Sequence, residues 1–352
     1  MAPAPIHRTR VRILRVLRIA LAWGVMACLA AVFEHATLLA HDTASRWVDR
    51  LNERLPTALL AGLIGGAVYI FVLRDRWRRL PYLHAVGIMA LLLLLVLLGL
   101  SAARTWIDHG TNILHQAFSF AGVSTYLYWC VVMASTMLMV RLNDQYGHGG
   151  LSNLTGLYHR PRQELRVFMF LDMRSSTTIA ERLGHTRYFE LLNELYADIT
   201  DPILYSRGDI YQYVGDEISV SWPFRRGVAR QRCIRCFLNI RSKLKARATH
   251  YQAKYGIAPV FKAGFHYGPV TTGEVGLVKK ERIYSGDVVN TTAHIQNECN
   301  QHGVDNLISD ELVKELRFPP SYVLRNLGTT ELKGRRQAIG LWTMEVADTT
   351  AQ

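Results

Sequence analysis

Four long apolar runs in the first 140 residues constrain this chain more than any other feature. Each is close to the roughly 20 residues that an α-helix needs to cross the hydrocarbon core of a bilayer. A cleaved signal peptide is a poor explanation of the first run, because no convincing small-residue cleavage site follows it and more apolar runs come later. The sequence therefore predicts an N-terminal helical transmembrane domain over residues 1–141, with about four spans at Ile13–Phe33, Leu55–Leu73, Ala85–Ala103 and Ala117–Val140.

The charge of the chain indicates how those spans are oriented. Lys and Arg number 41 against 28 Asp and Glu, which gives a formal net charge of +13. Basic residues gather on the cytoplasmic side of membrane helices, so we expect the N-terminus and the second half of the chain in the cytoplasm, at the cell (inner) membrane. The partner of this charge is expected to be the lipid bilayer and not nucleic acid, for which no motif is present. Two clusters beside the spans carry much of the excess: Arg8, Arg10, Arg12, Arg15 and Arg18, then Arg74, Arg76, Arg78 and Arg79.

The later spans hold no Asp, Glu, Lys or Arg at depth, which argues against an ion or proton pathway. We therefore interpret this half as an anchor, a dimerisation surface or a sensor. The five cysteines show no disulfide framework, which fits a reducing compartment. Cys233 and Cys236 form a CxxC in a helical pattern, where two small buried residues explain it better than a metal site.

The second half reads as a soluble domain over residues 165–346, after a linker at 142–164 and before a tail at 347–352. Its order of patterns is strand, helix, hairpin, helix, strand, hairpin, helix, short strand and helix, then closing strands. This order predicts an α+β sandwich of the ferredoxin-like type, with helices on one side of a mainly antiparallel sheet.

Two aspartates suggest a metal site. Asp172 ends a strand that reads as buried, and Asp216 sits in the turn of the hairpin Asp209–Trp222. In the expected sheet these strands are neighbours, so both carboxylates emerge at one edge. Paired carboxylates suit Mg²⁺, which takes oxygen ligands and shares them with phosphates. Taken alone, each residue is better explained by a helix N-cap or a turn; taken together, the two favour a metal site.

The loop after Asp172 is the second candidate feature. Its small polar residues lead into a helix, and free backbone N–H groups at a helix N-terminus can bind a triphosphate. Ordinary helix capping explains the Ser/Thr cluster equally well. The candidate substrate-binding residues here are Arg174, Ser175, Ser176 and Thr177.

Three ordered motifs give the domain a family resemblance. They are Phe170–Thr177, with the sequence FLDMRSST; Tyr213–Glu217, with YVGDE; and Ser285–Ala293, with SGDVVNTTA. Together they resemble the class III adenylate and guanylate cyclases, over roughly residues 165–346. The resemblance implies a homodimer with two active sites at its interface. It also implies that Asp172 and Asp216 hold two Mg²⁺ or Mn²⁺ ions per site, with the Met173 carbonyl as a further ligand.

The resemblance implies that Asn290 orients the ribose and that position 294 holds an arginine that stabilises charge on the α-phosphate. The two positions are four apart on an expected helix and so share a face. Here position 294 is His294, which is shorter and mostly neutral near pH 7. Losing such an arginine costs on the order of 10²- to 10⁵-fold in rate. Protonated His294, or Lys279, Lys280 or Arg282, are the candidates for the missing charge.

Three further positions bear on the nucleotide. Lys333 matches a family lysine that reaches the terminal phosphates, although a solvated turn lysine is an equal explanation. Adenylate cyclases of this class often carry Lys and Asp where this chain has Gln212 and Ile283, and the usual guanine pair is absent too. The Gln212 amide can still hydrogen-bond a base edge. ATP is favoured, and GTP or a pyrimidine nucleotide stays open.

The sequence thus predicts a membrane-anchored adenylate cyclase that converts ATP to 3′,5′-cyclic AMP and pyrophosphate by two-metal-ion catalysis. The first rival is a cyclase-fold membrane receptor or scaffold without activity, which His294 favours. The second is a diguanylate cyclase, whose Gly-Gly-Asp-Glu-Phe turn Val214–Glu217 partly matches. The helix of Asn290 and the turn of Lys333 are not expected in that class.

Overall fold

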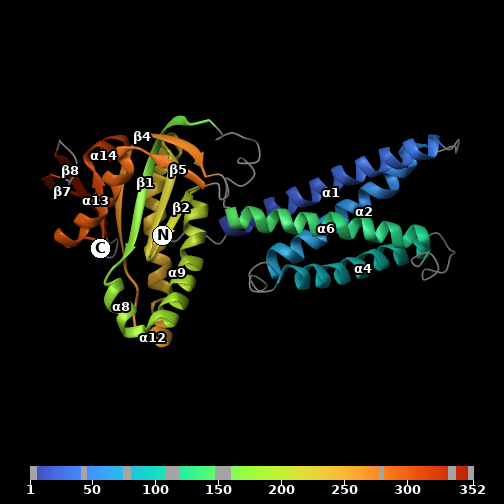
Figure 1. Ribbon diagram of the computed structural model, residues 1–352, viewed down its shortest axis with the longest axis horizontal. Helices are drawn as coiled ribbons and strands as arrows, with labels where there is room; N and C mark the ends of the chain where they lie inside the picture. The colour runs from blue at the N-terminus through green and yellow to red at the C-terminus, as the bar shows by residue number, and fades with distance from the viewer. Residues whose placement is uncertain are drawn as a thin grey trace. The chain divides into compact units, whose positions relative to one another are not determined.

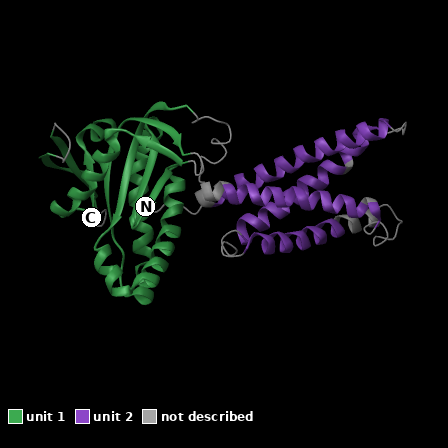
Figure 2. Ribbon diagram, in the orientation of Figure 1, with its two compact units in different colours: residues 1–3, 146–352 green, residues 4–145 purple. Residues whose placement is uncertain are grey.

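The computed structural model describes residues 6–40, 46–73, 81–107, 119–146, 160–276, 281–331 and 338–347. The chain divides into two compact units, one of residues 4–145 and one of residues 146–352 (Figure 2). Each unit has its own core and is described by itself.

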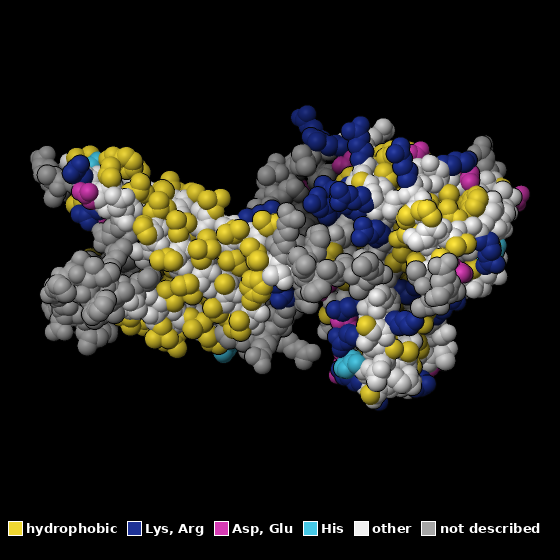
Figure 3. Space-filling view, turned by 180° about the vertical axis from the view of Figure 1, so that it is seen from behind, with side chains coloured by type: hydrophobic (Ala, Val, Ile, Leu, Met, Phe, Trp, Pro, Cys, Tyr) yellow, Lys and Arg dark blue, Asp and Glu magenta, His cyan; other side chains and the backbone are white. Residues whose placement is uncertain are grey.

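The first unit is entirely helical in its described residues (Figure 1). Four of its helices are long and apolar enough to cross a membrane, over Arg12–Ala40, Trp47–Leu73, Tyr82–Gly99 and Gly122–Leu142. Hydrophobic side chains cover much of its surface in Figure 3, as lipid-facing helices require. The elements are α1 (Ile6–Ala40), α2 (Trp47–Ala67), the π-helical turn η1 (Val68–Leu73), α4 (Tyr82–Ile107) and α6 (Phe120–Tyr146).

Aromatic side chains pack the helices of this unit together. The Trp23 ring on α1 stacks on Trp129 of α6 at 5.3 Å between centroids, and its Nε1 donates a hydrogen bond to Thr136 Oγ1 at 3.1 Å. The Tyr128 hydroxyl donates to the Met26 carbonyl at 3.0 Å. These bonds join α1 to α6.

The second unit is built on one eight-stranded sheet with the order β2-β3-β1-β4-β6-β8-β7, and β5 pairs with β4. The β4–β6 pair is parallel and the other pairs are antiparallel. This confirms an α+β fold with a mixed sheet. The strands are β1 (Arg162–Met173), β2 (Asp209–Val214), β3 (Glu217–Pro223), β4 (Phe261–Val275), β5 (Glu281–Ser285), β6 (Asn306–Ser309), β7 (Tyr322–Thr330) and β8 (Ile339–Val346).

Helices cover both faces of this sheet, whereas the sequence predicted them on one side. On β1, Val167, Met169 and Leu171 belong to the large core under α9 and α11, and Phe168 and Phe170 pack on the other side with residues of α13. The prediction failed because the apolar stripe of α13 does not reveal which face it covers. The helices are α8 (Ser176–Leu183), α9 (His185–Tyr205), α10 (Phe224–Val228), η3 (Ala229–Gln231), α11 (Arg232–Ala246), α12 (Ala248–Tyr255), α13 (Asp287–Gln301) and α14 (Asp310–Glu315).

The approach of α13 to the sheet depends on a glycine. A Cβ atom at Gly264 of β4 would lie 2.4 Å from the backbone nitrogen of Gln296. Any other residue there would push α13 off the sheet. The close contact brings the Gln296 side chain, which is 1% exposed, to the end of β1, where the candidate site lies.

Candidate active site

The Asp172 carboxylate lies at the C-terminal end of β1, on the face of the sheet that α13 covers. Its strand neighbour across β4 is Lys262, and the Lys262 Nζ lies 3.0 Å from Asp172 Oδ2. Gln296 Nε2 of α13 donates a second hydrogen bond to the same oxygen at 3.3 Å. The Lys262 side chain is 6% exposed and that of Asp172 is 22% exposed. A buried ammonium ion is stable only beside such a partner, so the two residues fix each other.

Asp216 comes from the turn between β2 and β3. Gly215 has a φ of +61°, a left-handed conformation that glycine adopts without strain. The Tyr196 hydroxyl of α9 donates a hydrogen bond to the Gly215 carbonyl and so holds the turn in place. Because β3 pairs with β1, the turn brings Asp216 beside Asp172.

The Asp172 carboxylate perturbs the pKa of Asp216. Burial raises the pKa of Asp216, the adjacent Asp172 raises it further, and the Ser176 hydroxyl opposes this by hydrogen bonding. Burial and the charge of Asp172 also raise the pKa of Glu217. Like charges held together in a partly buried site favour protonation or a bound cation. The arrangement therefore concentrates negative charge at one edge of the sheet.

A divalent cation fits this arrangement. Asp216 Oδ2 is buried and has no hydrogen-bond partner, a costly state that a cation would relieve. No group of three or more His, Cys, Asp and Glu side chains in metal-binding geometry occurs in the described part of the chain. The protein would thus supply two carboxylates, and backbone carbonyls such as that of Met173, phosphates or water would complete the coordination.

The loop after Met173 places the predicted substrate-binding residues in different surroundings. The Arg174 guanidinium, predicted to bind substrate, is held by Asp305 Oδ1 at 2.9 Å and by the Val304 carbonyl at 2.6 Å. Ser175 has a φ of +55° and is exposed, as is Thr177. Ser176 begins α8 and is the member of this loop that reaches Asp216.

Asn290 and His294 lie on the other face of α13 from Gln296. Val288, Ile295 and Gln296 are buried against the sheet, while Asn290 is exposed and His294 partly exposed. Among the residues that the structure describes, neither side chain forms a hydrogen bond or ion pair with Asp172 or Asp216. One chain therefore does not bring the predicted metal residues and the predicted ribose and phosphate residues together.

The remaining predicted positions lie farther along the sheet. Gln212 of β2 and Ile283 of β5 are both exposed, and each is next in sequence to a member of the Tyr211–Tyr284 ring pair, whose centroids are 4.8 Å apart. The two strands are thus brought close by those tyrosines. Lys333 lies outside the described residues, as do Lys279 and Lys280.

Sequence reasoning missed Lys262 and Gln296, which hold the Asp172 carboxylate. A signal for Lys262 existed, because it is a lysine between apolar neighbours in a strand and so points to the opposite face from them. The pairing of β1 with β4, which sets Lys262 opposite Asp172, could not be predicted from the sequence. For Gln296, a polar residue on the apolar side of a helix was the available signal.

Comparisons with known proteins define the class. The family model for the adenylate and guanylate cyclase catalytic domain matches residues 158–345, and the chain belongs to this family. The fold agrees: the solved structure of a bacterial light-regulated adenylyl cyclase superposes with a TM-score of 0.54 at 20% identity, over 65% of this chain and 67% of that one.

Two relatives are closer in sequence. Adenylate cyclase 2 of Rhizobium meliloti (strain 1021) is 41% identical over 194 residues, which are 55% of this chain and 53% of that protein. The adenylate cyclase of Anabaena cylindrica is 26% identical over 188 residues, 51% of this chain and 36% of that protein. The chain thus spans about half, or less, of the length of these relatives.

Proposed function

We propose that this chain is a membrane-anchored adenylate cyclase that converts ATP to 3′,5′-cyclic AMP and pyrophosphate. The observation that carries the proposal is the juxtaposition of Asp172 and Asp216 at one sheet edge, with an orphaned buried oxygen on Asp216. Membership of the cyclase family and relatives that are named adenylate cyclases support it.

The chain's own residues have separable tasks in this reaction. Asp172 and Asp216 hold Mg²⁺ or Mn²⁺, which when bound neutralises phosphate charge and lowers the pKa of the attacking ribose hydroxyl. Lys262 fixes the Asp172 carboxylate and adds a buried positive charge beside the phosphates. Asn290 orients the ribose, and His294, when protonated, faces the charge that develops on the α-phosphate. Positioning then provides most of the rate.

The proposal includes a homodimer. Asn290 and His294 point away from the aspartates of their own chain, so a site that uses all four residues needs a second copy. Lys333, Gln212 and Ile283 are proposed to contact the triphosphate and the base at the same interface. In a symmetric dimer, such an interface contains the site twice.

The membrane unit is proposed to anchor the enzyme in the cell (inner) membrane. Four spans would return the chain to its starting side, and the arginine clusters support the cytoplasm as that side. The catalytic unit then meets cytoplasmic ATP.

Product identification tests the proposal. The full chain in lipid nanodiscs is incubated with Mn²⁺ and ATP, GTP, CTP and UTP, and products are identified by mass spectrometry. We expect cyclic AMP, and we expect it to disappear in Asp172→Ala. Glu190→Gln, which alters an exposed carboxylate on α9, is the matched control and should keep its activity. Undiminished turnover in Asp172→Ala would refute the assignment.

His294 favours a second candidate, a cyclase-fold receptor or scaffold without turnover. Histidine is shorter than the arginine of the family motif and mostly neutral near pH 7. The same experiment separates the two: no product from any of the four nucleotides, in a chain that still binds Mn²⁺, would favour the scaffold. A cyclic product of another base would instead change only the substrate.

A further inference from the structure

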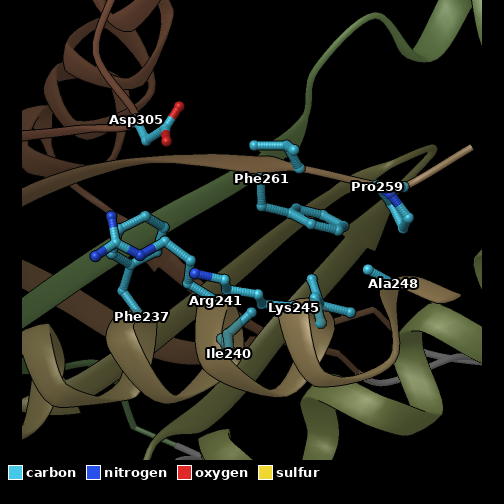
Figure 4. A pocket seen from close by; sticks show the side chains of 11 residues that line it. Phe237, Ile240, Arg241, Lys245, Ala248, Pro259, Phe261 and Asp305 are labelled. Carbon is cyan, nitrogen blue, oxygen red and sulfur yellow. The ribbon is translucent and has the colours of Figure 1, made fainter.

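A cavity opens on the catalytic unit, on the α11 side of the sheet, opposite the face on which the Asp172 carboxylate lies. Its volume is about 260 Å³, and it lies between α11, the start of β4 and the segment before it. Figure 4 shows Phe237, Arg241 and Lys245 on the helix and Phe261 on the facing strand. The walls are mainly apolar, with Phe237, Ile240, Pro259 and Phe261 among them.

The mouth of this cavity carries positive charge. Arg241 and Lys245 are four positions apart on α11, so they project from one face of it, and both are exposed. In the described part of the chain neither forms an ion pair with a carboxylate. The nearby acidic residue of the lining, Asp305, is already paired with Arg174 at 2.9 Å.

We propose that this cavity binds a small aromatic monocarboxylate. Buried side chains, Phe237 and Phe261 among them, form a close-packed apolar floor, and Val260, which is 42% exposed, adds apolar surface at the rim, so the cavity favours a flat apolar body. Arg241 supplies a planar fork that matches a carboxylate, and Lys245 adds a second charge. The volume lies just below the roughly 300 Å³ at which small-molecule sites usually begin, so one substituted ring fills it.

The walls of the cavity connect it to the candidate active site. Phe261 pairs with Met173 across the β1–β4 ladder, and the Val260 carbonyl accepts a hydrogen bond from the Arg174 amide at 2.9 Å. Asp305 holds the Arg174 side chain. A ligand here therefore rests against the supports of the loop that follows Asp172, and its binding should slow amide exchange in that loop.

The probe is 4-(trifluoromethyl)benzoate, observed by fluorine NMR during titration with the full chain in lipid nanodiscs. Its neutral isostere, 4-(trifluoromethyl)benzamide, and empty nanodiscs are the controls. We expect a Kd of about 1 mM or tighter for the acid, from the efficiency typical of small ligands. The amide should bind at least about tenfold more weakly, because it lacks the charge that Arg241 and Lys245 contact.

Variants locate the site. Arg241→Gln combined with Lys245→Gln should weaken binding of the acid by at least about tenfold, and Ala248→Leu should block the cavity. Arg235→Gln, an exposed arginine of α11 outside the lining, should leave binding unchanged. Hydrogen exchange should show protection at residues 257–262 and 173–176 on addition of the acid.

Several results would overturn the proposal. They are binding no stronger than to empty nanodiscs, equal affinity for acid and amide, displacement of the acid by an equal concentration of inorganic phosphate, or protection confined to other segments. The comparison of acid with amide uses the unaltered chain, so it does not depend on any variant folding. No turnover is measured, so these outcomes are independent of the proposed cyclase activity.

Discussion

The two faces of the catalytic sheet differ in how many polar side chains they bury. Under α9 and α11, the β1, β3 and β4 strands contribute Val167, Ile218, Trp222 and Phe265 to one large apolar core. The α13 side buries polar groups among smaller apolar clusters: Arg166, Ser219, Ser221, Lys262 and His266. Burying polar groups costs free energy unless they are paired, so their concentration on one face needs a reason.

The pairing of these groups indicates the reason. Arg166 bonds to Glu164 and Asp209, each at 2.9 Å, and its guanidinium lies 4.8 Å from the Tyr284 ring centroid. His266 Nδ1 lies 2.8 Å from Ser309 Oγ. The apolar face supplies stability, and the polar face holds chemical groups at fixed positions beside a proposed subunit interface. Mutations on the two faces should therefore differ in kind.

The largest effect is expected from Asp216→Asn on the polar face. Turnover should fall by on the order of 10³-fold, because a metal ligand is lost. The unfolding temperature of the metal-free chain should rise, since the new amide can donate to Asp172 and removes a repulsion, worth about 1 kcal/mol. Activity assays and thermal unfolding of the same preparation test this. A large fall in stability together with the loss of turnover would indicate that Asp216 has a structural role and not a metal-binding one.

On the apolar face, Leu195→Ala should do the reverse. Leu195 is fully buried in the large core, so truncation should cost about 3 kcal/mol of unfolding free energy. Turnover per folded molecule should stay within about twofold of the parent, because the core is separated from the aspartates by the sheet. Denaturant unfolding and activity normalised to folded protein provide the measurements. If Leu195→Ala lowered turnover as much as Asp216→Asn does, the proposed difference between the two faces would be wrong.

The His294→Arg variant tests whether the face of α13 that carries Asn290 and His294 takes part in catalysis. Restoring a permanent, longer cation should raise kcat by about tenfold if His294 faces the reacting phosphate. Asn300→Arg adds the same charge at an exposed position of α13 on a different side of the helix from His294 and serves as the control. An equal response of the two variants would show that only net charge matters.

Gln296→Leu tests the inner side of the same helix. Losing the hydrogen bond to Asp172 should weaken Mn²⁺ activation by about fivefold and leave the ATP KM near its parent value. Asn297→Ala controls for changes in the helix itself. An unchanged Mn²⁺ dependence would show that Gln296 contributes only to the packing of α13 on the sheet.

The smallest effect concerns the ion pairs that Glu194 of α9 forms with residues of α12. Burial alone would raise the pKa of Glu194, but hydrogen bonds from Lys254, His250 and Tyr255 outweigh it and hold this pKa at about 2. A lowered carboxyl pKa stabilises the fold above the ordinary value, and the contribution disappears as pH falls from about 4.5 toward 2.

The effect should be about 1 kcal/mol or less, because solvent screens this largely exposed cluster. Glu194→Gln should therefore lower the unfolding temperature at pH 7, and the decrease should be much smaller at pH 2.5, which lies close to the pKa of Glu194 in the folded chain. An equal difference at both pH values would exclude a contribution from ionised Glu194.

The sequence predicted features that depend on a single helix or strand. It missed contacts that depend on how strands pair and how helices pack on the sheet. The four spans and the order of strands follow from apolar periodicity, and the approach of Asp172 to Asp216 followed from one hairpin beside one strand. The partners of Asp172 did not, because the β1–β4 register places Lys262, and the rotation of α13 places Gln296. Arg174 shows the same limit: its guanidinium turns to Asp305, from a segment far away in sequence.

The central claim is that the site is split between two chains along α13. The direct test is a heterodimer purified through two different tags, with Asp216→Asn in one chain and Asn290→Ala in the other. Each variant alone should be inactive, and the heterodimer should recover about one half of the parent activity, because one of its two symmetric sites is intact. A heterodimer as inactive as the two single variants would contradict the account.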